Sequence, residues 1–394
     1  MTLLEILIVA LIAIYWCVSL LLLRGTYASA PSVVLLEDKL PRVSVLIAAR
    51  NEEHRLPGCL ESLLQSHYPA DKLQIVVVND RSSDRTGEIA ASFARRDARV
   101  MAVTCTRFLQ NMSGKTNALC DGMEHASGEI ILLTDADCLV PPHWVRAMVT
   151  QFTAEVGLVG GFTLLSPSPA LRNLLPASYR ASFFGKIQTL DWMYLLTVGA
   201  GAAGLDKPVS ILGNNFGFRR AAYEQSGGYA KLGFSIIEDF ALMRKILEHT
   251  KWRMRFALNA DTAIFSFPAP TWREYIDQRQ RWAAGGKEVG VFAKFLMLAA
   301  FFAHVMLLFA TVLAPSAAFF GGIAVLLMDG LLIWRGAAAL RYRAVLKYCP
   351  LFELYFILYS LVLALIVLFP LAVNWKGRRY RWNWRGKIKN VEEA

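Results

Sequence analysis

Residues 3–23 form an almost uninterrupted apolar segment near the start of the chain. At 1.5 Å per residue, a helix of this length crosses a hydrocarbon core of roughly 30 Å. Three more apolar stretches come late, at residues 295–313, 317–334 and 351–373. The chain is 55% hydrophobic with a mean hydropathy of +0.38, which is too apolar for a purely soluble protein of 394 residues. Any fold for this sequence must therefore place part of the chain in a bilayer.

The first apolar segment is predicted to be a retained span rather than a cleaved signal peptide. It lacks a basic start, its apolar run is too long, and Glu5 stands where Lys or Arg is expected. Arg24 follows the segment and no Lys or Arg precedes it, so the positive-inside rule places the N-terminus outside. The large region after Arg24 is then expected in the cytoplasm.

That region, residues 41–286, is mixed in character and long enough for one substantial α/β domain. Short apolar runs typical of strands buried on both faces alternate in it with helix-like segments. The runs are residues 43–49, 74–80, 100–105 and 129–135, and the helix-like segments are residues 55–65, 84–95 and 115–125. Right-handed crossovers then give a mostly parallel, Rossmann-like sheet with helices on both faces and a ligand crevice beyond the C-terminal strand ends.

The predicted order is an N-terminal anchor (1–24), the α/β domain with interfacial helices (41–286), two or three C-terminal spans (291–374) and a basic tail (375–394). Three late crossings would put the tail outside, whereas its seven Lys and Arg favour the inside. Residues 183–205 approach the length of a span but carry Lys186 and Asp191. A single crossing there would separate Asp137 from Asp239, so we expect this segment on the bilayer surface or buried under an acceptor cleft.

Charge and cysteine usage exclude several classes of function. The net charge of +11 gathers beside the apolar segments and in the tail, where anionic lipid headgroups are a simpler partner than nucleic acid. The six cysteines show neither CxxC nor metal-ligand spacing, so zinc sites and disulfides are not expected. Nothing in the sequence indicates an oligomeric state.

Polar residues follow three of the predicted strands, at residues 50–52, 79–80 and 135–137. Asp135 and Asp137 stand two residues apart where a buried strand ends, and two such carboxylates repel unless a cation lies between them. Oxygen ligands without His or Cys suit Mg²⁺ or Mn²⁺, which typically bridge carboxylates to the phosphates of a substrate. These positions suit a metal–diphosphate site, although for D-x-D taken alone a solvated turn or a helix N-cap is the commoner explanation.

Six motifs, taken together, resemble the membrane-bound branch of family 2 inverting glycosyltransferases with the GT-A fold. This branch includes ceramide glucosyltransferase and the cellulose, hyaluronan and poly-N-acetylglucosamine synthases. The motifs are VSVLIAARNEE (43–53), VVVNDRSSDRT (76–86), SGKTNAL (113–119), LLTDADC (132–138), IEDFAL (237–242) and QRQRW (278–282). The resemblance covers roughly residues 41–282 and implies a nucleotide-sugar donor, UDP being the expected nucleotide.

The resemblance assigns roles to residues of the donor site. It implies that Glu52 and Asp80 hold the base and ribose of the donor, with Lys115 nearby. Asp135 and Asp137 would carry Mg²⁺ or Mn²⁺ on the diphosphate, where a cation stabilises the charge that develops on the leaving group.

It also assigns the residues around the acceptor. Asp239, preceded by Glu238, matches the general base that takes the acceptor's proton. Gln278, Arg281 and Trp282 form the Q-x-x-R-W signature on one predicted helix face, suited to the diphosphate and to a sugar or lipid. Asn214 and Asn215, in LGNNFGFRR, are candidates for the acceptor side, with a structural turn as the alternative.

We therefore expect metal-dependent, inverting transfer of a sugar to a hydroxyl of a membrane lipid at the cytoplasmic face. The expected location is the plasma membrane, the inner membrane in a bacterium, with several spans. A processive polysaccharide synthase is the main alternative, and product length separates the two. A transporter or scaffold with an inactive transferase domain is a third hypothesis, and it predicts that motif residues are replaced. None is replaced, since the chain retains Asp80, Asp135, Asp137, Asp239, Gln278, Arg281 and Trp282.

Overall fold

The computed structural model describes residues 2–28, 36–106, 114–166, 175, 182–233, 235, 237–286, 289–368, 373–375, 378–382 and 388–393. Ser113 of the SGKTNAL motif and parts of the basic tail lie outside the described residues. The chain forms two compact units. The sheet unit contains Ser29–Ala181 and Ser210–Phe267, and the helical unit contains Met1–Ala28, Ser182–Val209 and Pro268–Ala394.

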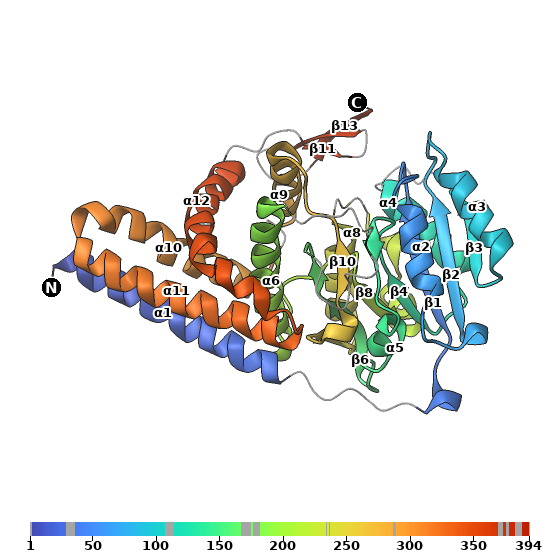
Figure 1. The fold of residues 1–394 in the computed structure, drawn as a ribbon, viewed down its shortest axis with the longest axis horizontal. Coiled ribbons are helices and arrows are strands. Elements are labelled where there is room, and N and C mark those ends of the chain that lie inside the picture. Colours follow the sequence, from blue (N-terminus) through green and yellow to red (C-terminus); the bar gives the residue numbers. More distant parts are fainter. Residues whose placement is uncertain are drawn as a thin grey trace. The chain divides into compact units, whose positions relative to one another are not determined.

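The sheet unit is built on seven strands in the order β3-β2-β1-β4-β8-β6-β9 (Figure 1). β8 runs antiparallel to both of its neighbours, and the other pairs are parallel. The strands are β1 (Val43–Ala49), β2 (Leu73–Asn79), β3 (Val100–Thr104), β4 (Ile130–Leu133), β6 (Val156–Gly161), β8 (Phe216–Arg219) and β9 (Arg253–Ala257). The predicted mostly parallel sheet is confirmed.

Helices cover both faces of this sheet, as predicted. One core joins Val45 and Ile47 of β1 to apolar residues of α2 (Leu56–Leu64), α3 (Thr86–Arg96) and α5 (Trp144–Val149). On the opposite face, α4 (Gly114–His125) packs so closely that a Cβ at Gly122 would lie 2.3 Å from Leu46 and 2.7 Å from Val78. Because successive side chains of a strand point to opposite faces, a strand such as β1, which is apolar apart from Ser44, requires a helix on each side.

A second, smaller sheet has the order β5-β10-β7 and lies in the same unit. Its strands are β5 (Cys138–Leu139), β7 (Thr163–Leu164) and β10 (Ile264–Ser266). The unit is completed by α7 (Arg220–Ser226) and α8 (Glu238–His249). β5 begins directly after Asp137 and therefore fixes the chain beyond the predicted metal motif.

The helical unit contains α1 (Leu3–Tyr27), α6 (Phe183–Gly204), α9 (Trp272–Gly286), α10 (Val291–Leu313), α11 (Pro315–Ala339) and α12 (Cys349–Leu368). A small antiparallel sheet of β11 (Val373–Trp375), β12 (Arg378–Trp382) and β13 (Ile388–Glu393) follows. Within the described residues, four helices are long and apolar enough to cross a membrane: Leu3–Tyr27, Val291–Leu313, Pro315–Ala339 and Arg343–Ile366.

α6 is an internal helix of this unit, not an element on its surface. Most of its residues are buried, and it packs against α1, α11 and α12. Its crossing with α1 depends on glycine, because a Cβ at Gly25 would lie 2.0 Å from the carbonyl oxygen of Gly201. In a bilayer the hydrophobic effect does not drive one apolar helix against another. Such helices pack instead through close approach of their backbones at small residues.

Candidate functional site

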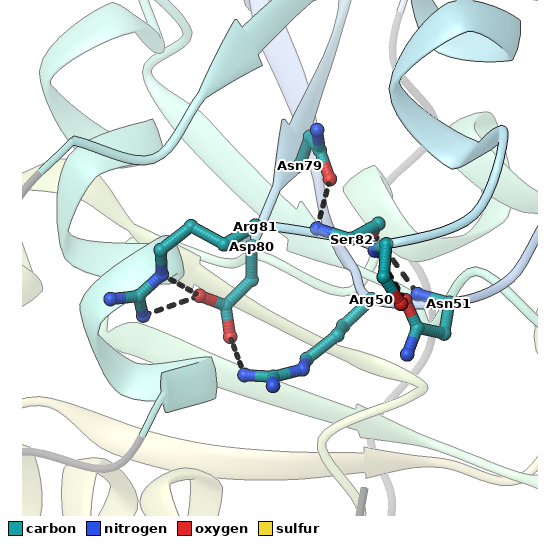
Figure 2. A network of polar contacts seen from close by, with 7 residues as sticks. Arg50, Asn51, Asn79, Asp80, Arg81 and Ser82 are labelled. Carbon is teal, nitrogen blue, oxygen red and sulfur yellow. Dashed lines mark hydrogen bonds and ion pairs between the residues drawn. The ribbon is translucent and has the colours of Figure 1, made fainter. Parts of the chain in front are cut away.

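The ends of β1 and β2 hold Asp80 between two arginines (Figure 2). Arg81 donates to Asp80 Oδ1 from Nη2 at 2.7 Å and from Nε at 3.1 Å. Arg50 Nη1 lies 3.9 Å from Oδ2. The Asp80 side chain is only 6% exposed, and its backbone N–H donates to Ala49 O, which extends the β1–β2 pairing by one residue. A buried carboxylate is stable only when paired in this way.

The loops after β1 and β2 are locked together and conformationally strained. Asn51 and Arg81 have positive φ angles of 54° and 52°, which residues other than glycine adopt only at a cost. Asn51 N–H donates to Ser82 Oγ at 3.1 Å, and Ser82 N–H donates to Asn79 Oδ1 at 3.0 Å (Figure 2). Hydrogen bonds therefore hold the loops after β1 and β2 to each other.

Lys115 joins two of the predicted acidic residues. Its Nζ lies 2.8 Å from Asp135 Oδ1 and 3.0 Å from Glu238 Oε1. Burial alone lowers the pKa of Lys115, but the two carboxylates outweigh burial and hold the pKa above its ordinary value. Lys115 at the start of α4, Asp135 after β4 and Glu238 at the start of α8 are thus brought together from distant parts of the chain.

Asp137 is the second carboxylate of the D-x-D motif. Its Oδ2 lies 3.5 Å from Arg55 Nη1, and the Arg55 guanidinium in turn lies 5.0 Å from the centre of the Phe267 ring. The side chains of Asp135 and Asp137 are 34% and 27% exposed, far more than that of Asp80. Two reachable carboxylates without His or Cys fit the oxygen preference of Mg²⁺ or Mn²⁺.

Glu52 belongs to the same charged region. Its backbone N–H donates to Thr86 Oγ1 at 2.8 Å, which anchors the β1 loop to α3. Burial raises the pKa of the Cys59 thiol, and the charges of Asp137, Asp135 and Glu52 raise it further. All three carboxylates therefore lie near enough to Cys59 to raise the pKa of its thiol.

Asp239 lies at the start of α8 and is held by two backbone N–H groups. Gly213 N–H donates to Oδ2 at 2.5 Å, and Phe240 N–H donates to Oδ1 at 2.8 Å. Burial and the neighbouring charge of Glu238 raise the pKa of Asp239 to about 6, against the opposing effect of Lys115. A carboxylate with such a pKa accepts a proton more readily than an ordinary aspartate does.

Asn214 and Asn215 are buried, and both are bound to protein groups. Asn214 Oδ1 accepts from Thr163 Oγ1 at 2.9 Å. Asn215 donates from Nδ2 to Phe162 O and Thr262 O at 2.7 and 2.8 Å, and its Oδ1 accepts from the indole of Trp144 at 3.0 Å. Because both amide hydrogens of Asn215 are used in this way, we do not propose an acceptor role for it.

The Q-x-x-R-W residues lie on α9, in the helical unit, where Arg281 and Trp282 are half-buried. Trp282 packs on Trp192 of α6 with ring centroids 5.3 Å apart. Gln278 Oε1 is buried without a hydrogen-bond partner among the described residues. The predicted contact of these residues with the donor stays a prediction.

Sequence reasoning missed the cations that hold the acidic residues. Arg50 was named among the polar residues at a strand end but was not paired with Asp80, and Arg81 directly follows Asp80 in the sequence, which was the available signal. Arg279, inside the QRQRW motif, is fully buried and pairs with Asp191 of α6. No spacing in the sequence connects residues 88 positions apart, so this pair could not be predicted.

The sequence of this chain is similar to a known family profile and to proteins named as glycosyltransferases or polysaccharide synthases. The sequence profile described as "Glycosyl transferase family 2" matches residues 44–225. "Probable glycosyltransferase YdaM" of Bacillus subtilis is 31% identical over 254 residues, covering 64% of this chain and 56% of that protein. A "Poly-beta-1,6-N-acetyl-D-glucosamine synthase" of Staphylococcus epidermidis is 28% identical over 250 residues, covering 63% and 55%. The chain thus matches little more than half the length of these relatives.

Among solved structures, the fold is similar to that of "Mannosyltransferase PcManGT from Pyrobaculum calidifontis in complex with GDP-Man and Mn2+". The TM-score is 0.53 at 22% sequence identity, with 91% of this chain and 98% of the other covered. At this level of identity the likeness concerns the fold.

Proposed function

We propose that this protein, whose residues 44–225 match the profile described as "Glycosyl transferase family 2", transfers a sugar, with inversion, from a nucleotide-diphosphate sugar to a hydroxyl acceptor. The observation that carries the proposal is Asp239, a half-buried carboxylate with its pKa raised to about 6. It adjoins Glu238, which shares Lys115 with Asp135 of the D-x-D motif. A proton acceptor is thereby linked to the proposed donor site within one unit.

Inversion requires a single displacement at the anomeric carbon. The acceptor oxygen forms a bond to that carbon while the bond from the carbon to the diphosphate oxygen breaks, and the hydroxyl proton passes to Asp239. The N–H groups of Gly213 and Phe240 hold the Asp239 carboxylate in one orientation for this transfer. The raised pKa supports Asp239 as general base, because a catalytic base works best when its pKa lies near the working pH.

We assign the donor to the crevice lined by the strand ends. Asp80, fixed by Arg50 and Arg81, and Glu52 would bind the nucleoside. Asp135 and Asp137 would hold Mg²⁺ or Mn²⁺, which would neutralise the diphosphate leaving group. Lys115 already pairs with Asp135 at 2.8 Å and would therefore lie beside the diphosphate.

We propose a membrane lipid as the acceptor and the cytoplasmic face as the site of transfer. Four helices suited to cross a membrane support association with a bilayer, and Arg24 in the last turn of the first of them supports a cytoplasmic sheet unit. A plasma membrane location with basic segments against anionic headgroups belongs to the same proposal.

A processive polysaccharide synthase is the second candidate. It is favoured by the similarity to a protein named poly-beta-1,6-N-acetyl-D-glucosamine synthase. Both candidates share the chemistry at Asp239 and differ in whether the product is released after one sugar.

The test uses the full-length chain in native-lipid membranes with Mn²⁺ or Mg²⁺ and a panel of UDP- and GDP-sugars. Nucleotide release and the partition of labelled sugar between organic and aqueous phases are measured. We expect one sugar per lipid in the organic phase, and a loss of roughly 10²–10⁴-fold in kcat for Asp239→Asn. The exposed Asp71→Asn is the matched control and should keep full activity.

Long water-soluble polymer from the wild type would establish the synthase instead. Equal rates for the wild type and Asp239→Asn would show that Asp239 is not the base.

A further inference from the structure

A second cluster of ionisable side chains lies inside the helical unit, apart from every motif used above. His304 of α10, Asp329 of α11 and Glu353 of α12 bring their ligand atoms within 4.8 Å of one another. The side chains of His304, Asp329 and Glu353 are 0%, 1% and 12% exposed. All three helices are among those suited to cross a membrane, where ionisable residues are costly and mark functional sites.

The tautomer of His304 is fixed by the backbone. Nδ1 lies 2.6 Å from the carbonyl oxygen of Ala300, which can only accept a hydrogen bond, so Nδ1 carries the proton. Nε2 then points at two carboxylates, 3.1 Å from Asp329 Oδ2 and 3.7 Å from Glu353 Oε2. When the ring is neutral, the lone pair of Nε2 faces carboxylate oxygens, an arrangement that a metal cation between them would satisfy.

Asp329 is oriented from its other side. The hydroxyl of Tyr15, on α1, donates to Asp329 Oδ1 and lies 2.9 Å from the hydroxyl of Tyr194, on α6. Metal sites typically have such an outer shell of hydrogen bonds. Here it holds His304 through Nδ1 and Asp329 through Oδ1, the atoms that face away from the cluster. Glu353 Oε1 is buried and, in the described part of the chain, has no hydrogen-bond partner.

Distances and charge both match a divalent ion. Ligands about 2.0–2.1 Å from a tetrahedral ion are about 3.4 Å from one another, close to the 3.1 and 3.7 Å measured here. Within the described residues, neither Asp329 nor Glu353 forms an ion pair with Lys or Arg. With both carboxylates ionised and the histidine neutral, the three side chains would carry a charge of −2, which one divalent cation would cancel.

We propose that His304, Asp329 and Glu353 form a binding site for one first-row divalent cation, Zn²⁺ or Mn²⁺, that ties α10, α11 and α12 together. One nitrogen and two oxygen ligands suit these ions, and three protein ligands leave a fourth position for water or a polar group. The site is independent of the proposed glycosyl transfer and of the cation expected at Asp135 and Asp137.

The test measures bound metal rather than activity. Full-length protein carrying Asp135→Asn and Asp137→Asn is stripped with a chelator, equilibrated with buffered Zn²⁺ and analysed for metal per chain. We expect about one equivalent, and a 10- to 100-fold weaker affinity after Glu353→Gln or His304→Gln. His249→Gln, at an exposed histidine of α8, is the matched control and should leave the equivalent unchanged.

Two further readouts distinguish a site from a damaged fold. Zn²⁺ should raise the Tm of the Asp135→Asn, Asp137→Asn protein and not that of the same protein with Glu353→Gln, which keeps the shape of the side chain. Bound Co²⁺ should give a visible absorption band that disappears with His304→Gln. The proposal fails if the Asp135→Asn, Asp137→Asn protein binds no Zn²⁺. It fails also if adding Glu353→Gln or His304→Gln to that protein leaves Zn²⁺ binding unchanged, because the cluster would then hold protons rather than a metal ion.

Discussion

Asp239 shows how one side chain acquires the properties of a base from its neighbours. Its pKa is raised by burial and by Glu238, while two N–H groups and Lys115 favour the ionised form and limit the rise. The result, about 6, keeps the group ionised at neutral pH and more basic than a surface aspartate.

The pH dependence of transfer follows from this pKa. A base must be deprotonated, so we expect kcat/KM to fall about tenfold per pH unit below about 6 and to level off above it. Initial rates between pH 5 and 8 at saturating metal measure this. An inflection near 4, the ordinary value for aspartate, would mean that the acting base is not Asp239 in this environment.

Gly213 is the residue that leaves room for Asp239. A Cβ at this position would lie 2.9 Å from Asp239 Oδ2 and 3.1 Å from its Cβ. We expect Gly213→Ala to lower kcat by about 10- to 100-fold, because displacing a catalytic group by about 1 Å has effects of this size.

Steady-state kinetics and the Tm measure that variant against a control. A Cβ at Gly58 would lie 3.4 Å from Leu139, which is an ordinary contact in the same unit. Gly58→Ala should therefore keep both activity and stability. A Gly213→Ala variant with full kcat would show that Asp239 tolerates movement.

Among the elements, α6 and α9 are joined by a buried ion pair. Asp191 and Arg279 are both fully buried, and the Arg279 guanidinium lies 4.5–5.2 Å from the rings of Trp282, Tyr275 and Tyr359. Removing one charge of such a pair leaves the other unpaired in a poorly solvating interior.

We therefore expect Asp191→Leu to lower the free energy of unfolding by about 3–5 kcal/mol. Asp191→Leu combined with Arg279→Met should recover most of the loss, because no unpaired charge remains. Denaturant unfolding in detergent measures both. Arg244→Gln, in an exposed pair with Glu248, serves as the control and should cost less than about 1 kcal/mol. Equal losses for the single and double variants would contradict the argument.

Elements differed in how well the sequence predicted them, for physical reasons. β1, β2, β3 and β4 were predicted to within two residues because they are apolar on both faces and separated by amphipathic helices. β5, β7 and β10 have only two or three residues each, too few to show a period. α6 was recognised as apolar, but its place inside the helical unit depends on Gly25, Gly201 and Asp191, whose partners lie far away in the sequence.

For the molecule as a whole, the predicted fold class is confirmed by the sheet, and residues 44–225 match the profile of the predicted family. The site residues stay predictions. The sequence indicated which carboxylates end the strands, because that follows from strand order alone. It could not supply their cationic partners Arg50, Arg55 and Arg81, since ion pairs depend on loop conformations such as the positive φ of Arg81.

Activity of the whole molecule is expected to depend on a bound divalent metal ion. Chelation should reduce glycosyl transfer at least about 100-fold, and added Mn²⁺ or Mg²⁺ should restore it, since the leaving group carries charge that needs a cation. Transfer rates across a metal titration measure this. Asp137→Asn should raise the metal concentration required, whereas Glu155→Gln, at an exposed pair with Arg253, should not. Full activity in chelator would contradict a metal-dependent reaction.

The position of β8 in the sheet constrains how early the sheet can be completed while the chain is being synthesised. This strand pairs with β4 on one side and β6 on the other, yet it is translated after both and after α6. While α6 emerges from the ribosome, β4 and β6 are complete but the strand that belongs between them does not yet exist. Until β8 is made, the edges of β4 and β6 that will face it stay unpaired, and unpaired strand edges are where wrong strand pairing can begin.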